Sequence, residues 1–151
     1  MGDTASIGLQ GLGGGLQAGA EQGAGKIQNT IYKFNSKIQN LQAQDAIDIG
    51  LKKEQNFRKK VKKFAADQRL AFAAQGIDIE SGTALDVQMD TAEQGEIDAL
   101  TIRNNAYLEA WGYKVGAENS KTQGEFAELS GEMASMGTIL STASNIYASI
   151  K

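Results

Sequence analysis

The 151-residue chain contains no proline, no cysteine and no histidine. Without proline it lacks the residue that most often breaks helices and forms turns, so long helices are expected. The absence of cysteine excludes disulfides and thiolate ligands, and the absence of histidine removes the commonest general base. The carboxylates Glu93, Glu96 and Asp98 have no nucleophile motif or phosphate-binding loop beside them. We therefore expect no enzymatic activity, no cofactor and no metal site.

Charge is distributed unevenly along the chain. Residues 26–75 carry eleven Lys or Arg against four acids, a net charge of +7, whereas residues 76–151 carry four against twelve, a net charge of −8. Residues 4–20 and 133–150 contain no charged residue. Opposite charge in the two halves indicates that they pack against each other or that they face different partners. No secretory signal and no conventional transmembrane helix is recognisable.

The apolar residues recur at helical spacing. A first series runs in steps of four and three from Ile27 through Ile31, Phe34 and Ile38 to Leu41. A second series, in the C-terminal part, has a seven-residue period typical of a helix that packs on another helix. Because the face opposite this series has no charges after Glu132, we expect the C-terminal helix to meet protein on several sides or a membrane. The second series consists of Phe126, Leu129, Met133, Met136, Leu140, Ala143, Tyr147 and Ile150.

The clearest break lies between the two halves of the chain. Gly76 followed by Ile77 is typical of a helix C-terminus, so the first long helix should end near Ala74. Thr83 and Asp86 have the spacing of a capping box, with Ser81 as a competing N-cap, so the next helix is expected to begin at about Thr83. Residues 119–124 are polar enough for a bend, and the sequence leaves open whether the helix breaks there.

Four glycines near the N-terminus recur at intervals of four residues: Gly11, Gly15, Gly19 and Gly23. This glycine ladder is compatible with a flexible glycine-rich tail. It is also typical of a helix face on which another backbone packs closely, in an oligomer or a bilayer. The alanines and leucines between the glycines favour the packing interpretation, because a flexible linker does not require them.

Seven of the basic residues lie between positions 51 and 64. They form either a solvated helix face or a surface for nucleic-acid phosphate, anionic lipid or the acidic half of a neighbouring subunit. Nothing in the pattern reads bases. We call this group the basic run: Lys52, Lys53, Arg58, Lys59, Lys60, Lys62 and Lys63.

Residues 76–113 contain a distinctive set of residues: Gly76, Ser81, Gly82, Thr83, Asp90, Gly95, Glu96, Asp98, Ala99, Ile102, Arg103, Asn105, Gly112 and Tyr113. In these residues the segment resembles a recurring segment of the internal virion proteins, or ejection proteins, of short-tailed bacteriophages. The resemblance implies a protein packaged with the genome near the portal, which leaves the particle during infection. It further implies that several copies assemble with larger ejection proteins into a conduit across the host envelope.

The sequence thus predicts an all-α chain, extended rather than globular, built on an antiparallel helical hairpin. A lone hairpin with so few large apolar residues would be marginal, so a homo-oligomer, in the form of a ring or tube, is expected. The expected role is that of an ejection protein in the virion and then in the host envelope. It would contact the portal, larger ejection proteins, the host membrane and, non-specifically, DNA. A static adaptor of the portal or tail, and a pore-forming or translocator protein unrelated to phage, remain alternatives. The expected segments are residues 1–25 (glycine-rich helix or tail), 26–75 (basic helix), 76–83 (turn), 84–124 (acidic helix) and 125–151 (uncharged helix).

Overall fold

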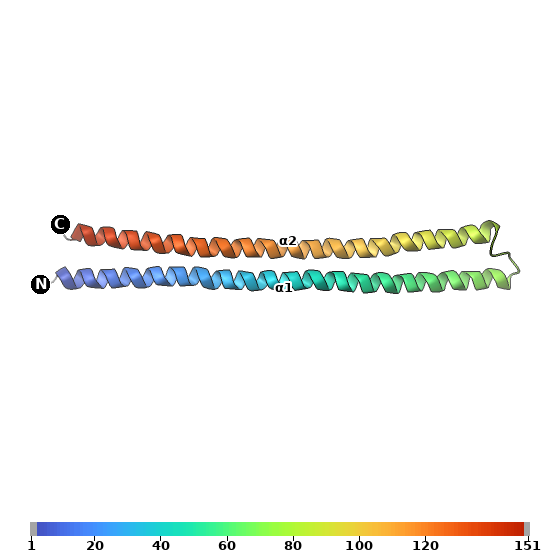
Figure 1. The fold of residues 1–151 in the computed structure, drawn as a ribbon, viewed down its shortest axis with the longest axis horizontal. Coiled ribbons are helices and arrows are strands. Elements are labelled where there is room, and N and C mark those ends of the chain that lie inside the picture. Colours follow the sequence, from blue (N-terminus) through green and yellow to red (C-terminus); the bar gives the residue numbers. More distant parts are fainter. Residues whose placement is uncertain (1–2, 150–151) are drawn as a thin grey trace. The chain divides into compact units, whose positions relative to one another are not determined.

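The computed structural model describes residues 3–149, and the side chains of residues 11–149. Helix α1 spans Asp3–Ala74 and helix α2 spans Gly82–Ser149 (Figure 1). The two long helices pack together, and the described residues contain no strand. The predicted all-α class is confirmed. Residues 1–2 and 150–151, including Ile150 of the C-terminal apolar series, lie outside the described residues.

The turn between the helices confirms the predicted end of α1. Gly76 has a φ of +71°, and the amide of Ile77 donates a hydrogen bond to the carbonyl oxygen of Phe72 at 3.1 Å. A left-handed glycine with this backbone hydrogen bond is a common way to end a helix. The first long helix therefore stops at Ala74, as the sequence predicts.

The start of α2 differs in detail from the predicted capping box. The helix begins at Gly82, which has a φ of +57°, so Thr83 already lies inside its first turn. Asp78 organises the turn instead, because its carboxylate accepts hydrogen bonds from the Glu80 amide at 2.9 Å and from the Ser81 hydroxyl at 2.6 Å. These two bonds lower the pKa of Asp78, with the Ser81 bond as the larger cause.

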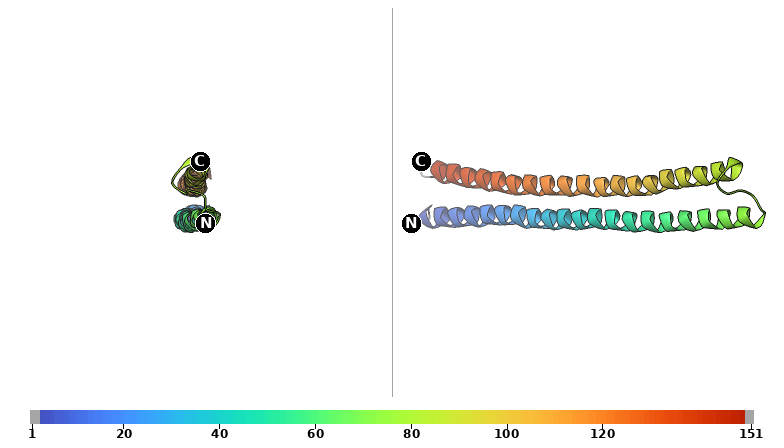
Figure 2. Two further views of the ribbon diagram at one scale, coloured as in Figure 1. Left: turned by 90° about the vertical axis from the view of Figure 1, so that its right-hand side faces the viewer. Right: turned by 45° about the vertical axis from the view of Figure 1, so that its right-hand side comes forward.

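Both helices run without a break across the segment boundaries that composition suggests (Figure 2). Helix α1 includes the glycine-rich segment from Asp3 onward, and α2 passes through residues 119–124 without a bend. Two residues of this segment contact α1: Ser120 donates a hydrogen bond to Gln39 at 3.2 Å, and Gly124 is buried against Asn29 and Tyr32. Their polarity and small size therefore serve helix packing.

The chain divides into two units, each containing a piece of both helices. The first unit is Met1–Gln39 with Val115–Lys151, and the second is Asn40–Lys114, which includes the turn. Within each unit the helices are antiparallel. In the first, for example, Gly11 lies near Ile146 and Gly25 near Gly131. The antiparallel pairing predicted from the sequence is thus present in each unit.

Candidate assembly surfaces and basic face

The buried face of the hairpin consists mainly of small residues. In the second unit, Ala43, Ala46 and Ala110 form a cluster against which Ile47 and Tyr113 pack. No large side chain is fully buried among the described residues. Since a buried methyl or methylene group contributes only about 0.8 kcal/mol, an alanine face stabilises a hairpin weakly compared with a leucine face.

In the first unit, the backbones of the two helices approach to contact distance. A Cβ added to Gly25 would lie 2.8 Å from the carbonyl oxygen of Ala127 and 3.2 Å from the Cα of Gly131. A Cβ added to Gly131 would lie 2.8 Å from the carbonyl oxygen of Glu21. Only glycine fits at both positions without a backbone shift.

Polar side chains join the helices on either side of this contact. Asn29, which is 3% exposed, donates a hydrogen bond to Glu128, and the Thr138 hydroxyl donates one to Glu21 at 2.9 Å. Buried hydrogen bonds stabilise modestly but are costly to leave unmade, so they favour one alignment of the helices over sliding.

Between residues 84 and 117, the buried positions of α2 follow an 11-residue period, which the sequence reasoning missed. Three turns of an α-helix cover about 11 residues, so such positions stay on one side of a nearly straight helix. The evenly spaced small residues carried this signal in the sequence, whereas the predicted faces rested mainly on large apolar residues. The recurring buried positions are Ala84, Gly95, Ala106 and Ala117, with Ala99 and Ala110 between them.

The large apolar series predicted from the sequence lie on the outer faces of the helices. On α2, the candidate residues Met133, Met136, Leu140 and Tyr147 are 65%, 63%, 68% and 68% exposed. Phe126 and Leu129 of the same series are exposed as well. We call the six residues Phe126, Leu129, Met133, Met136, Leu140 and Tyr147 the α2 seam.

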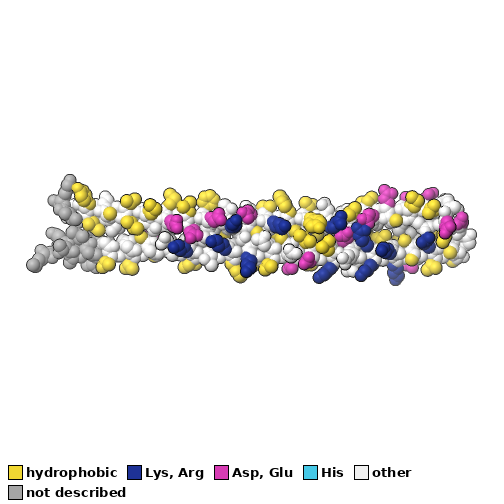
Figure 3. All heavy atoms as spheres, viewed as in Figure 1, with side chains coloured by type: hydrophobic (Ala, Val, Ile, Leu, Met, Phe, Trp, Pro, Cys, Tyr) yellow, Lys and Arg dark blue, Asp and Glu magenta, His cyan; other side chains and the backbone are white. Residues whose placement is uncertain are grey.

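Helix α1 has a matching outer series in the same unit. Ile27, Ile31, Phe34 and Ile38, here called the α1 seam, are between 39% and 65% exposed. Figure 3 shows hydrophobic side chains along the outer margins of the molecule, where a monomer normally places polar ones. The two seams are unpartnered surfaces of the isolated hairpin.

The glycine ladder lies mostly away from the contact between the helices. A Cβ added to Gly15, Gly19 or Gly23 would meet nothing within 4 Å, whereas one at Gly11 would lie 3.8 Å from the Ile146 side chain. The close intramolecular approach therefore uses Gly25 and not the ladder. Packing of the ladder against another molecule stays a prediction.

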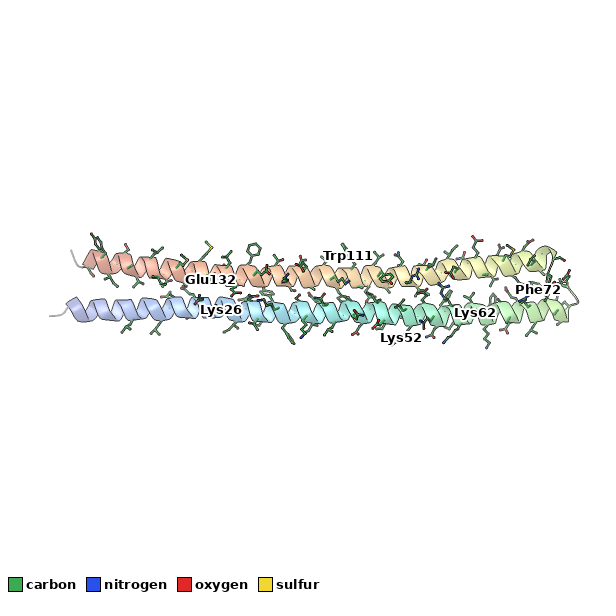
Figure 4. The ribbon with its side chains drawn as sticks, viewed as in Figure 1. Lys26, Lys52, Lys62, Phe72, Trp111 and Glu132 are labelled. Atoms are coloured by element: carbon green, nitrogen blue, oxygen red, sulfur yellow. The ribbon has the colours of Figure 1, made fainter. Side chains whose placement is uncertain are left out.

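Six members of the basic run are exposed, and one has an internal role. Lys52, Lys59 and Lys63, at spacings of seven and four, lie on the side of α1 away from α2, where Figure 4 shows Lys52. The exposed members as a set are Lys52, Lys53, Lys59, Lys60, Lys62 and Lys63. Such a surface attracts phosphate groups without reading sequence.

Arg58 instead joins the helices of the second unit. Its guanidinium donates hydrogen bonds to Glu54, at 2.9 Å, and to Glu96, at 2.8 Å. Glu54 is buried, and the Arg103 guanidinium lies 3.8 Å from the same carboxylate oxygen. The bond to Glu96 is the largest cause that raises the pKa of Arg58, and it holds the pKa of Glu96 below its usual range. Arg58 is therefore a structural clamp rather than a free cation.

The remaining candidates show no built catalytic or ligand site. Glu93 and Asp98 are exposed, and Glu96 is engaged by Arg58. An open hollow of about 480 Å³ in the second unit has an apolar floor of Phe57, Val61 and Phe64. Within the described part of the chain, no three acidic side chains are grouped as they would be around a metal ion.

Neither α1 nor α2, over residues 3–149, has a stretch both long and apolar enough to cross a membrane.

Comparisons with protein-family models, curated proteins and solved structures gave no match.

Proposed function

We propose that the chain is an internal virion protein of the ejection type from a bacteriophage. In this proposal it is an extended helical hairpin that forms a homo-oligomer near the portal and contributes to a channel for genome delivery across the host envelope. It works beside larger ejection proteins and the portal. It catalyses no reaction.

The observation that carries the proposal is the exposure of the two apolar seams. A hairpin that buries alanine and glycine and exposes methionine, leucine and phenylalanine is built as a subunit of a larger assembly. Hydrophobic burial is the dominant favourable contribution to most protein association, so the seams supply the affinity that the inner face lacks. The resemblance of residues 76–113 to ejection proteins then favours a virion as the setting of that assembly.

The basic run supports a location close to packaged DNA. Phosphate contacts provide affinity that does not depend on sequence and that weakens with salt, which suits a protein that must release or pass any genome segment. The uncharged residues 133–149 form the C-terminal part of α2 and suit contact with hydrophobic partners, including the host membrane.

The proposal is tested in particles produced from the genome that encodes the chain. Quantitative mass spectrometry compares full particles with particles that have released their DNA. An ejection protein is present in the first and depleted from the second. A protein retained in equal amount is a static adaptor of the portal or tail, and absence from both overturns the virion assignment.

A second experiment addresses the channel. Purified chain is added to anionic liposomes filled with a small dye, and leakage is followed by fluorescence. Leakage that is reduced by Gly15→Leu with Gly19→Leu, but not by Gly13→Leu, is expected. Gly13 is a matched control, because a Cβ there also meets nothing within 4 Å and it does not belong to the ladder. Absence of leakage contradicts the channel role.

A further inference from the structure

We infer that the α1 seam of one copy packs antiparallel against the α2 seam of a second copy, so that each chain uses both seams with two different neighbours. This inference rests on the self-assembly part of the proposed function. It names the two surfaces that meet, their direction and the charges that align them.

The two seams lie on outward-facing sides of the first unit. Ile27, Phe34 and Ile38 each follow a buried or half-buried residue by two positions. Since each residue of a helix turns by about 100°, two positions correspond to the opposite side of the helix. Phe126 and Met133 likewise follow Gly124 and Gly131, which face α1, by two positions. One hairpin therefore presents one seam to each side.

The seven-residue period of the seams indicates that the partner covering each seam is a helix. The α1 seam advances by four, three and four residues, and the α2 seam by three, four, three, four and seven, which is a seven-residue period throughout. This spacing is that of knobs packing into holes on a second helix. Over the same stretch the inward positions of α2 advance in the same steps, so both faces of this part of α2 have the spacing of helix packing. These inward positions are Gly124, Glu128, Gly131, Ser135, Thr138 and Thr142. A lipid surface requires no such narrow, regular stripe.

Opposite charges flank the two seams. On α1, a lysine stands directly before a seam residue three times: Lys26 before Ile27, Lys33 before Phe34, and Lys37 before Ile38. On α2, a glutamate on the outer side stands directly before a seam residue twice: Glu125 before Phe126, and Glu132 before Met133. Glu128, which precedes Leu129, instead accepts a hydrogen bond from Asn29 within the hairpin. Among the described side chains, no ion pair joins these lysines to these glutamates within the hairpin.

The position of the charges selects the antiparallel direction. In both helices the charge lies one residue before the seam, and so on the same rotational side of it. When two helices face each other antiparallel, these sides come together, and in a parallel pair they point apart. Charges that flank a seam set the choice and orientation of the partner helix. Lys33 and Lys37 of one copy thus meet Glu125 and Glu132 of the other.

The apolar surface area that the two seams expose is close to the area buried in a specific protein–protein interface. A large apolar side chain has roughly 200 Å² of accessible surface. The exposed fractions of the four α1-seam residues and of Phe126, Leu129, Met133 and Met136 then correspond to roughly 900 Å² of apolar surface per contact. The flanking lysines and glutamates add to this, which brings the contact to the lower limit of about 1,200 Å² for stable interfaces.

Because the two contacting surfaces differ, the interface is heterologous. Such contacts generate a ring when the rotation closes and a filament when it does not. Copies of this chain alone therefore suffice to cover both seams of every subunit in a closed assembly, without any other partner.

Charge reversal tests the inference on the full chain. Lys33→Glu with Lys37→Glu places acids against acids, and Glu125→Lys with Glu132→Lys places bases against bases. We expect each pair to weaken self-association by about tenfold or more in sedimentation velocity, because like charges meet at the contact. The four changes together restore the complementary arrangement and should recover most of the affinity. A control pair, Arg69→Glu with Lys114→Glu, changes net charge equally on exposed residues outside the seams.

Disulfide trapping adds a direct readout, since the chain has no cysteine. Copies with Ile38→Cys are mixed with copies carrying Phe126→Cys, the seam residue that the charge pairing places opposite Ile38, and a mixed disulfide is expected. Ser141→Cys, an exposed position beside the α2 seam, serves as the control and should not trap.

Each outcome either supports or contradicts the pairing of the two seams. Suppose the wild type assembles, but the four changes together do not restore the affinity and no mixed disulfide forms. The pairing of the seams is then wrong, although self-assembly itself stands. Wild-type chain that stays monomeric at every concentration contradicts self-assembly itself, and with it the proposed function.

Discussion

Gly25 of α1 and Gly131 of α2 meet backbone to backbone. A Cβ on Gly25 would lie 3.2 Å from the Cα of Gly131, and a Cβ on Gly131 would lie 3.1 Å from the Cα of Gly25. Neither helix can carry a side chain there without moving the other. The pair therefore fixes how closely the helices of the first unit approach.

Replacement of Gly25 by alanine should destabilise the protein, although alanine is the better helix former. Overpacking at a tight contact costs about 1–3 kcal/mol. The added helix propensity offsets about 1 kcal/mol of that. Gly19→Ala, where the new Cβ meets nothing within 4 Å, should raise the free energy of unfolding by up to about 1 kcal/mol. Urea unfolding followed by circular dichroism measures both variants, and equal effects would contradict the close approach.

Loss of the Arg58 clamp should destabilise the second unit. Arg58→Met removes the hydrogen bonds to Glu54 and Glu96 and leaves the buried Glu54 with only Arg103, 3.8 Å away. A buried carboxylate that loses its charged donor costs about 1–3 kcal/mol. Lys59→Met, at the exposed neighbouring position, is the control and should change the urea midpoint little. An Arg58 variant as stable as this control would show that the clamp contributes nothing.

The stabilisation from Glu96 should depend on pH. Arg58 holds the pKa of Glu96 in the folded protein below its ordinary value of about 4.3 in unfolded chains. The contribution is therefore fully present above about pH 4.3 and is lost as the pH falls through the lower folded pKa. Because Glu96 is exposed, the effect is small. The wild type should unfold at higher urea than Glu96→Gln at pH 7, with the gap closing toward pH 3. A gap that is constant with pH would contradict the assignment.

The outer lysines of the basic run should control binding to DNA. Changing Lys52, Lys59 and Lys63 to glutamine removes up to three charges that can neutralise phosphates. The slope of log affinity against log salt should then fall by about 0.9 for each phosphate that is no longer neutralised, measured by fluorescence anisotropy with a duplex of arbitrary sequence. A control with Arg69, Lys114 and Lys121 changed to glutamine removes equal charge elsewhere. Equal weakening in both variants would indicate that only net charge matters.

The course of the backbone could be predicted because its signals are local. The absence of proline, the helical spacing from Ile27 onward and the Gly76–Ile77 pair predict two helices and the turn between them, and each of these features is present. The bend considered at residues 119–124 did not occur. Ser120 and Gly124 are polar or small because they contact α1, which depends on a partner far away in the sequence.

The direction of the faces could not be predicted from the same signals. Large apolar residues at helical spacing normally indicate the core, but here Phe34 and Met136 are 62% and 63% exposed while alanine and glycine are buried. A period indicates that a face exists and does not show which neighbour covers it. Arg58 was grouped with the lysines for a similar reason, since its partner Glu96 lies on the other helix.

The central claim is that the outward apolar seams join copies of this chain. Sedimentation velocity over a range of protein concentrations tests it most directly, on the wild type and on Met136→Gln with Leu140→Gln. Leu70→Gln with Leu108→Gln, two exposed residues of the second unit, is the control. We expect the wild type and the control to assemble as the concentration rises. The seam variant should remain a monomer with unchanged helicity by circular dichroism. A seam variant that assembles as the wild type does, or a wild type that never assembles, would contradict the account.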